Sequence, residues 1–312
     1  MNEIQTIGIP RGLMYYRDGA LWKKFFENLG YTCIVSPKSS RETLERGMEY
    51  AIDESCLPQK MYVGHVLALA GRCDAIFIPR MGGFTAREKL CTRYEALPDL
   101  TRNLLRDYGL RIISLSYDWN DRTSEEDVWR EFGMSLGKDR KASKKAYSEA
   151  KKYQNRILKE RQKRQNEQLK SPGLKVLMAG HPYVLHDAYM GAELERILTS
   201  MGAAVLFTDD MNRADAVKRS YHFSDTMPWV VNREIVGASL LLKDKVDGII
   251  LVSAYPCGPD GLVDDMMVRK IRDLPVLQLT LDAQNGTAGL ETRIESFIDI
   301  IQYQKAGGYG SK

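Results

Sequence analysis

The chain has 312 residues, 44% of them hydrophobic, which is enough for two domains of ordinary size that each bury a core. No apolar run approaches the ~20 residues that cross a bilayer, and the opening "MNEIQTIGIP" lacks the charged and apolar regions of a signal peptide. We therefore expect a soluble, cytoplasmic protein with no membrane partner.

Strands and helices alternate along the chain. Short apolar runs predict strands in "TIGIP", "TCIVSP", "DAIFIPR" and "RIISLSY", and then in "LKVLMAG", "AAVLFTD", "VDGIILVSAY" and "PVLQLTLD", with helical patterns between them. This β-α-β alternation is typical of parallel sheets with right-handed crossovers. The sequence therefore predicts an α/β protein with two doubly wound, flavodoxin- or Rossmann-like lobes, at 1–137 and 173–312.

A basic segment, 138–172, separates the two predicted lobes. Residues 138–170 include thirteen Lys and Arg against four Asp and Glu, with no Gly or Pro, which predicts a long and mostly solvated helix. The excess positive charge of the chain, +4 overall, is therefore local. No nucleic-acid motif accompanies it, so we expect no nucleic-acid partner. The helix is either an exposed connector or a docking surface for an acidic protein.

The five cysteines are odd in number and widely spaced, which does not fit a disulfide framework. Cys33 lies within a predicted strand and Cys73 at a helix-to-strand turn, so both are predicted to be structural. Cys56, Cys91 and Cys257 instead fall at loop-to-helix junctions, where a helix N-terminus stabilises a thiolate. Three thiolates with an open position suit an iron–sulfur cubane. Inert thiols are the alternative.

Four further polar residues need a role. His181 follows the first strand of the second lobe, so we expect it at the same sheet edge as Cys257. Ligands of parallel sheets collect at this edge, at the carboxyl ends of the strands. It either acts in the site, by bonding to a cluster sulfide or a substrate, or is a satisfied loop histidine. His186 and Asp187 could cap the next helix. His65 lies in an apolar helix and is predicted to be a core histidine.

Several stretches, taken in order, carry a family resemblance. These are "IGIPRGLMYY", "DESCLPQKMYVGHV", "IFIPR", "GHPYVLHDAY", "CGPD" and "TAGLETRIESFID". Together they resemble the activase-related branch of the 2-hydroxyacyl-CoA dehydratase family (DUF2229-like), over nearly the whole chain except the basic helix. The resemblance implies a [4Fe-4S] cluster, or a double cubane shared with a second subunit, in a cleft between the lobes. The implied ligands are Cys56, Cys91 and Cys257.

The resemblance also implies partners. Members of this family receive low-potential electrons from an ATP-hydrolysing activator protein. The activator and a second dehydratase-like module occur fused to similar sequences in longer proteins, so we expect them here as separate chains, with a dimer formed with self or with the dehydratase-like chain. The sequence shows neither GxGxxG nor GxxxxGK[ST], so we do not expect this chain to hydrolyse ATP itself.

Two functions stay open from sequence. The first is a reductively activated enzyme or enzyme subunit that acts on a small molecule or acyl-CoA, which three rather than four cysteine ligands favour. The second is an accessory electron carrier. Relatives usually carry an acidic residue and a histidine in the loop that follows Asp282, where this chain has Ala283 and Gln284. This loss of acid–base groups favours the accessory electron carrier. A metal-free ligand-binding α/β protein is a third possibility.

Overall fold

The computed structural model describes residues 3–85, 88–118, 123–283 and 289–307. The chain divides into two compact units: unit 1 is Met1–Lys159 with Pro228–Val230, and unit 2 is Glu160–Met227 with Val231–Lys312. Each unit contains a four-stranded parallel sheet with helices, so the predicted α/β fold with two parallel-sheet lobes is confirmed. Within the described ranges, no helix is both long and apolar enough to cross a membrane.

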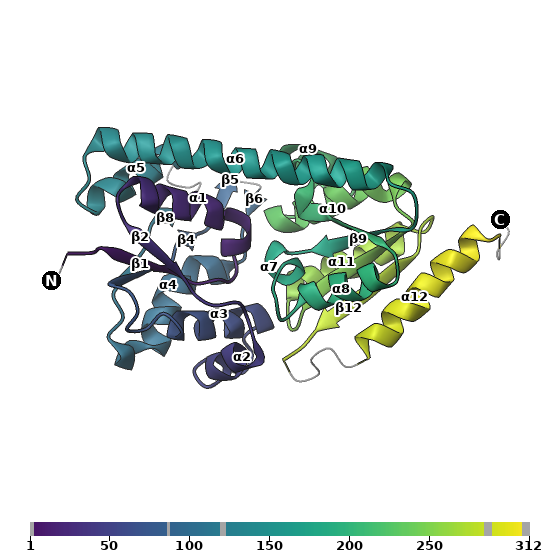
Figure 1. Ribbon diagram of the computed structural model, residues 1–312, viewed down its shortest axis with the longest axis horizontal. Coiled ribbons are helices and arrows are strands. Elements are labelled where there is room, and N and C mark those ends of the chain that lie inside the picture. Colours follow the sequence, from purple (N-terminus) through teal and green to yellow (C-terminus); the bar gives the residue numbers. More distant parts are fainter. Residues whose placement is uncertain (1–2, 86–87, 119–122, 284–288, 308–312) are drawn as a thin grey trace. The chain divides into compact units, whose positions relative to one another are not determined.

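The sheet of unit 1 has the strand order β2-β1-β3-β7, and all its pairings are parallel (Figure 1). Its strands are β1 (Thr6–Ile9), β2 (Thr32–Val35), β3 (Ala75–Phe77) and β7 (Ile112–Ile113). Two small pairings follow: β4 (Arg80–Met81) with β8 (Ser116–Tyr117), and β5 (Gly83–Thr85) with β6 (Glu88–Lys89). The strand predicted in "RIISLSY" is thus two short strands.

An aromatic cluster forms the core of unit 1. The helices of this unit are α1 (Tyr15–Asn28), α2 (Arg41–Met48), α3 (Leu57–Leu67), α4 (Thr92–Leu104) and α5 (Glu125–Ser135). The Phe77 ring of β3 lies 5.3 Å from that of Trp22 and 5.0 Å from that of Phe26, both on α1. It also lies 6.0 Å from the Trp129 ring of α5. Buried rings of this size dominate the packing of α1 and α5 against the sheet.

Helices α2 and α3 approach each other closely because glycines face the contact. A Cβ atom on Gly64 would lie 1.9 Å from the Thr43 carbonyl oxygen, and one on Gly47 would lie 1.9 Å from the Lys60 carbonyl oxygen. Only glycine therefore allows this contact between the two backbones. The contact holds α3 in place, and Cys56 lies at its start.

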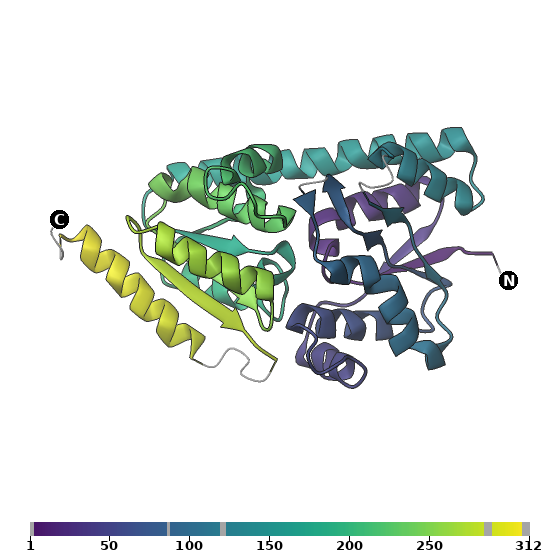
Figure 2. The same cartoon turned by 180° about the vertical axis from the view of Figure 1, so that it is seen from behind.

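The sheet of unit 2 has the order β10-β9-β11-β12 and is also entirely parallel. Its strands are β9 (Lys175–Gly180), β10 (Ala204–Phe207), β11 (Gly248–Ala254) and β12 (Val276–Leu281). Helices α8 and α12 cover one face, and α10 and α11 cover the other (Figures 1 and 2). The helices of this unit are α7 (Pro182–Leu185), α8 (Gly191–Ser200), α9 (Arg213–Ser220), α10 (Val230–Leu242), α11 (Gly258–Lys270) and α12 (Leu290–Lys305).

The two sheets share one strand order, in which the second strand of the unit is followed by the first, third and fourth. This is the start of the flavodoxin-like order, whose ligand-binding switch point lies between the first and third strands. The shared order agrees with the internal repeat that "RCDAIFIPR" and "KVDGIILVSAYP" suggest. In unit 2 the switch point lies between β9 and β11.

Helix α6 (Arg140–Lys170) lies where the sequence predicts the basic helix, and the division between the units falls inside it. It is not simply a solvated connector, because one face is buried. In unit 1, Ala146 and Ala150 are at most 2% exposed, and Gln154 Nε2 donates to Asp18 Oδ1 at 2.9 Å. In unit 2, Gln165 Oε1 accepts from a backbone N–H of β10 at 2.7 Å. The helix therefore belongs to the core of each unit.

Candidate functional site

Cys257 lies at the carboxyl edge of the unit 2 sheet. Strand β11 ends three residues before it, and the Cys257 backbone N–H donates to the Ala254 carbonyl at 2.9 Å. Cys257 is the N-cap of α11, with an extended backbone at φ −87° and ψ 103°. The partial positive charge at a helix N-terminus favours an anion such as a thiolate at this position.

Asp260, in the first turn of α11, is the centre of a buried hydrogen-bonded cluster. It is 4% exposed, and its Oδ1 lies 2.9 Å from His181 Nε2 and 2.8 Å from the donating Asn232 Nδ2. Burial acts to raise the pKa of Asp260, but the neighbouring His181 and hydrogen bonds from His181, Asn232 and the Cys257 thiol outweigh it and hold the pKa below its usual range. Asp260 is therefore an ionised carboxylate that touches both Cys257 and His181.

His181 is the N-cap of α7, directly after β9, so it lies across the switch point from the end of β11. Its side chain is 7% exposed, and its ring stacks on the Tyr183 ring with a centroid separation of 4.8 Å. An ionised carboxylate only accepts hydrogen bonds, so the nitrogen that faces Asp260 carries the proton. The other ring nitrogen, Nδ1, is buried and has no hydrogen-bond partner in the described part of the chain.

Asp264 is a second buried carboxyl on the same face of α11, one turn beyond Asp260. Burial, followed by the negative charge of Asp260, raises the pKa of Asp264 to about 7, while a hydrogen bond with Ser253 opposes the shift. Sequence reasoning missed both carboxyl groups. The signal for them was the i, i+4 spacing after "CGP", which places two acids on one helix face. Asn232 comes from α10, and no local pattern indicates it.

Cys56 and Cys91 lie at helix N-termini in unit 1. Cys56 is the N-cap of α3 and Cys91 the N-cap of α4, and both have extended backbones, with ψ 151° and ψ 136°. Neither side chain caps its own helix with a hydrogen bond. Arg93, in the first turn of α4, donates to Oε1 of the buried Gln59, in the first turn of α3. This bond joins the two helix N-termini that begin at the candidate cysteines.

Cys33 and Cys73 lie in surroundings that suppress ionisation. Burial raises the pKa of Cys33 to about 12, and its Sγ lies 3.7 Å from the Lys23 carbonyl oxygen. Burial also raises the pKa of Cys73, whose Sγ lies 3.5 Å from the Leu69 carbonyl oxygen. Thiols that stay protonated are poor nucleophiles and poor metal ligands. This agrees with the structural role that the sequence predicts for both.

The structure does not by itself assemble a metal site. Within the ranges that it describes, no three His, Cys, Asp or Glu side chains are placed to hold a metal ion. Cys56 and Cys91 belong to unit 1 and Cys257 to unit 2, so their predicted convergence in one cleft stays a prediction. Of the loop that departs from the family pattern, Ala283 is described and Gln284 lies outside the described residues.

Two other histidines, His65 and His186, have structural partners. His65 is completely buried and bonded through both ring nitrogens to serine hydroxyls, at 3.0 and 2.9 Å, so the prediction of a core histidine is confirmed. His186 does not cap the next helix, α8, whose N-cap is Met190, but is the C-cap residue of α7. Its side-chain Nε2 lies 2.9 Å from both Asp209 oxygens and 3.0 Å from Arg161. Asp187 does not cap α8 either: its carboxylate accepts from the Tyr189 backbone N–H, at 2.8 Å, in the turn before that helix.

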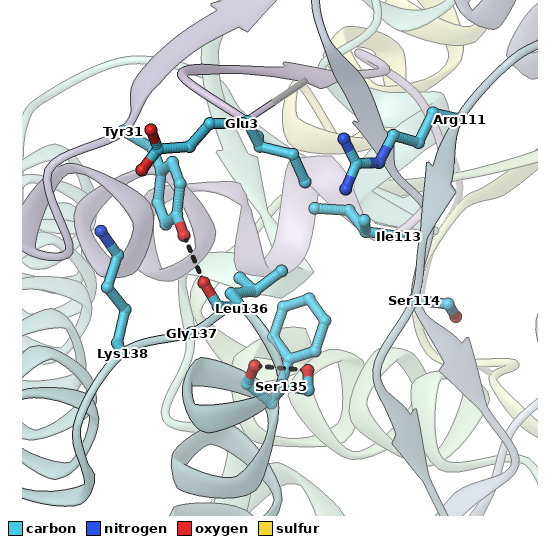
Figure 3. Close-up of a pocket in the computed structure, with 11 residues that line it drawn as sticks. Glu3, Tyr31, Arg111, Ile113, Ser114, Ser135, Leu136, Gly137 and Lys138 are labelled. Carbon is cyan, nitrogen blue, oxygen red and sulfur yellow. Dashed lines mark hydrogen bonds between the residues drawn. The ribbon is translucent and has the colours of Figure 1, made fainter. Parts of the chain in front are cut away.

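A separate hollow of about 570 Å³ lies at the opposite, amino edge of the unit 1 sheet (Figure 3). Figure 3 shows Arg111 and Lys138 on opposite sides of the view, with Glu3 directed toward Tyr31. The Tyr31 hydroxyl donates to the Leu136 carbonyl at 3.0 Å, and Lys138 Nζ lies 4.6 Å from the Tyr31 ring centroid. Because ligands of parallel α/β sheets collect at the carboxyl edge, we place the candidate site at the cysteines instead.

Comparison with known proteins gives one informative match. The model of the family described as "CoA enzyme activase uncharacterised domain (DUF2229)" matches residues 6–211, which is more than half of the chain. No curated protein matches the chain. Among solved structures, the laminin-binding protein Lbp of Streptococcus pyogenes is 11% identical over 97% of this chain and 99% of its own, with a TM-score of 0.26. That structural similarity is too low to support an argument about fold or function.

Proposed function

The chain belongs to the CoA enzyme activase family DUF2229, and from this premise we propose that it is an iron–sulfur protein of the 2-hydroxyacyl-CoA dehydratase type. Cys56, Cys91 and Cys257 would hold a [4Fe-4S] cluster, or a double cubane shared with a second subunit. Such a cluster, when bound, supplies a low-potential electron or a Lewis-acidic iron to a small molecule or acyl-CoA. An ATP-hydrolysing activator protein would provide the electron.

One observation carries the proposal: each of the three candidate ligands is the N-cap of a helix, on extended backbone. The first-turn amides of a helix carry partial positive charge, which stabilises thiolates and an anionic cluster. The two remaining cysteines, Cys33 and Cys73, have raised pKa values and suit no such role. Three ligand-type thiols with one position left open fit the donor set of a cubane whose fourth iron binds another group.

The side chains around these cysteines have definable tasks. Arg93 and Gln59 hold the starts of α3 and α4 together, and the Arg93 guanidinium adds positive charge beside them. Asp260 contacts the Cys257 thiol and orients His181, whose buried Nδ1 has no hydrogen-bond partner among the described residues. If the protein is an enzyme, His181 is the candidate catalytic residue.

We expect Cys91→Ser to lose most of the iron that the wild-type chain binds. A serine oxygen is a harder ligand than a thiolate sulfur, and a serine hydroxyl is a far weaker acid than a thiol. Cys73→Ser is the matched control, since it changes a half-buried thiol of the same unit that makes no proposed ligand bond. The measurement is anaerobic reconstitution with iron and sulfide, followed by metal analysis and EPR spectroscopy, with about four irons per wild-type chain expected for one cubane. Equal iron loss in the two variants, or no iron in the wild type, contradicts the assignment.

An accessory electron carrier is the second candidate, and the sequence "LDAQNG" at 281–286 favours it, because titratable groups usual in relatives are missing there. The two functions differ in what the reduced protein does. With activator and ATP present, an enzyme converts many equivalents of a 2-hydroxyacyl-CoA for each reduced cluster. A carrier leaves the thioester unchanged and passes one electron to a dehydratase-like partner chain.

A further inference from the structure

Residues 111–117 form one continuous strand edge in unit 1. Backbone N–H groups of β3, β4 and their neighbours donate at 2.8–3.0 Å to alternate carbonyls of this stretch, those of Arg111, Ile113, Leu115 and Tyr117. Strands β7 and β8 are therefore joined in one parallel ladder with β3 and β4. Strand β7 ends the strand order of its sheet, and β8 has only β4 as a partner. In the described part of the chain, no strand pairs with the other side of this edge.

The other side of the edge presents backbone groups without a strand partner. Along a strand, the backbone groups of successive residues point alternately to its two sides, so those of Ile112, Ser114 and Ser116 point away from β3 and β4. Ser116 is exposed, and the other two residues are half-buried. A hollow of about 390 Å³ lies beside them, lined on one side by residues 114–116 and on the other by α5. The space next to this edge is therefore open among the described residues.

The edge lacks the features that protect most exposed strands. Natural edge strands carry proline, an inward-facing charge or a bulge, which prevent pairing with another chain. The stretch "RIISLSY" has no proline and only one charged residue, at its first position, and its register with β3 and β4 has no shift. In the flavodoxin-like order a fifth strand follows the fourth, and no described strand takes this place beside β7. The edge is therefore suited to pair with a strand of another chain.

We propose that this edge pairs with the same edge of a second copy of the chain, antiparallel about a two-fold axis at Ser114. A two-fold interface brings one surface patch against itself, so the two strands run in opposite directions. With the axis at Ser114, that residue lies opposite its own copy, and Ile112 lies opposite the partner's Ser116. This register pairs all three outward-facing residues of each chain. A shift along the strand leaves some of them unpaired.

The side chains match in the same register. Ile113 lies opposite the partner's Leu115, which makes an apolar cross-strand pair. Arg111 lies opposite the partner's Tyr117, an arrangement that favours a cation–π contact. The two Ser114 hydroxyls meet at the axis, and no like charges face each other, because Arg111 is the only charged residue of the edge. This self-complementarity favours a second copy over a segment of a different protein. The inference does not depend on the proposed function, since it involves neither the candidate cysteines nor a metal.

The first test is the oligomeric state of the full-length chain, kept in reductant and measured by analytical ultracentrifugation over a range of concentrations. We expect a dimer. Ser114→Pro should weaken it about a hundredfold, because each of the two hydrogen bonds that the paired serines exchange contributes about tenfold. The bonds with β3 and β4 should survive, because the Ser114 N–H points away from them and proline is tolerated at such edge positions.

Val35→Pro is the matched control. Val35 lies on β2, the opposite edge of the sheet, and its N–H also points away from the sheet, because the next N–H, that of Ser36, donates to the Ile9 carbonyl of β1. This variant should keep the dimer. Circular dichroism shows whether both proline variants are folded.

Cross-linking tests the register without proline. In an antiparallel hydrogen-bonded pair the two Cα atoms lie about 5.5 Å apart, which suits a disulfide. Mild oxidation should therefore join two Ser114→Cys chains covalently. Ser116→Cys is the control on the same strand: its Cα atom and that of its own copy lie about 14 Å apart, so no disulfide should form between them. The wild-type chain gives the background from the native cysteines.

Three results overturn the proposal. The first is a wild-type chain that stays monomeric, which leaves the edge to a segment of a different protein. The second is a dimer that Ser114→Pro and Val35→Pro weaken equally. The third is equal cross-linking of Ser114→Cys and Ser116→Cys, and this comparison decides the question if Ser114→Pro does not fold.

Discussion

Asp209→Asn should destabilise unit 2 by about 3 kcal/mol, because it removes the central charge of a buried ion-pair network. The Asp209 side chain is 10% exposed and lies 2.9 Å from His186 Nε2 and 2.7 Å from Arg161. Arg161 keeps one further partner, Asp210, at 2.5 Å, so the guanidinium is not left wholly unpaired. The measurement is the urea midpoint, with hydrogen exchange of β9 and β11 to assign the transition to unit 2.

The same network predicts how stability depends on pH. Burial acts to lower the pKa of His186, but the charge and hydrogen bond of Asp209 outweigh it and raise the pKa above 6.5. The pKa of His186 is therefore higher in the folded state than in the unfolded state. Its stabilising effect is complete below the unfolded-state pKa and is lost as the pH rises through the folded-state pKa. Unit 2 of the wild-type protein should therefore lose stability as the pH rises above 6.5, the ordinary pKa of a histidine.

Two variants check this dependence. His186→Gln cannot titrate, and Asp209→Asn removes the charge that raises the pKa, so both should show a flatter profile in this range. The pKa of Asp209 is lowered from 3.8, since His186 and Arg161 outweigh the effect of burial, and its own contribution is lost only in acid. An unchanged slope above neutral pH in both variants would contradict the role of the His186–Asp209 pair.

Arg233→Ala is the second large effect, with an expected loss of about 4 kcal/mol in the stability of unit 2. Arg233 is 1% exposed, and its guanidinium donates to Ser220 Oγ at 3.2 Å and to the carbonyls of Ser224 and Asp225 at 3.1 and 3.0 Å. It also lies 4.0 Å from the Tyr221 ring centroid. Truncation leaves a cavity and strips the buried Ser220 hydroxyl and two partly buried carbonyls of their donor.

Arg233→Lys is the matched control for charge. An ammonium keeps the cation but has no planar fork that reaches both carbonyl oxygens and stacks on a ring, so an intermediate loss is expected. Chemical denaturation with exchange of the 220–225 amides measures both variants. If Arg233→Lys is as stable as the wild type, the geometry of the guanidinium is not what matters, and the positive charge alone accounts for the stabilisation.

The fold could be predicted where local patterns match the final environment. Strand β11, Gly248–Ala254, is apolar apart from Ser253 and is buried at every position, so its sequence alone indicates a central strand. The strands β4 to β6 have two or three residues and no apolar run, so no local pattern indicates them; β4 also depends on a partner distant in sequence, β8. The buried face of α6 was missed because alanines and serines between lysines give little hydrophobic signal.

The candidate site also has features that the sequence predicts and features that it does not. Prolines and strand ends mark the helix starts at Cys56 and Cys257, so N-cap positions can be predicted from short stretches. The bond between Arg93 and Gln59 joins residues 34 apart in sequence, and that between Asn232 and Asp260 joins residues 28 apart. Neither follows from spacing, because only the packed fold decides which polar side chains meet.

The arrangement of α6 has a consequence for proteolysis. Trypsin needs several residues of extended backbone, and α6 offers many basic side chains in a helix whose two halves are built into different cores. Cleavage after Lys151 or Lys152 therefore requires opening of unit 1, whereas cleavage after Arg161 or Lys163 requires opening of unit 2. The order in which the tryptic fragments of α6 form therefore shows which of the two units opens first.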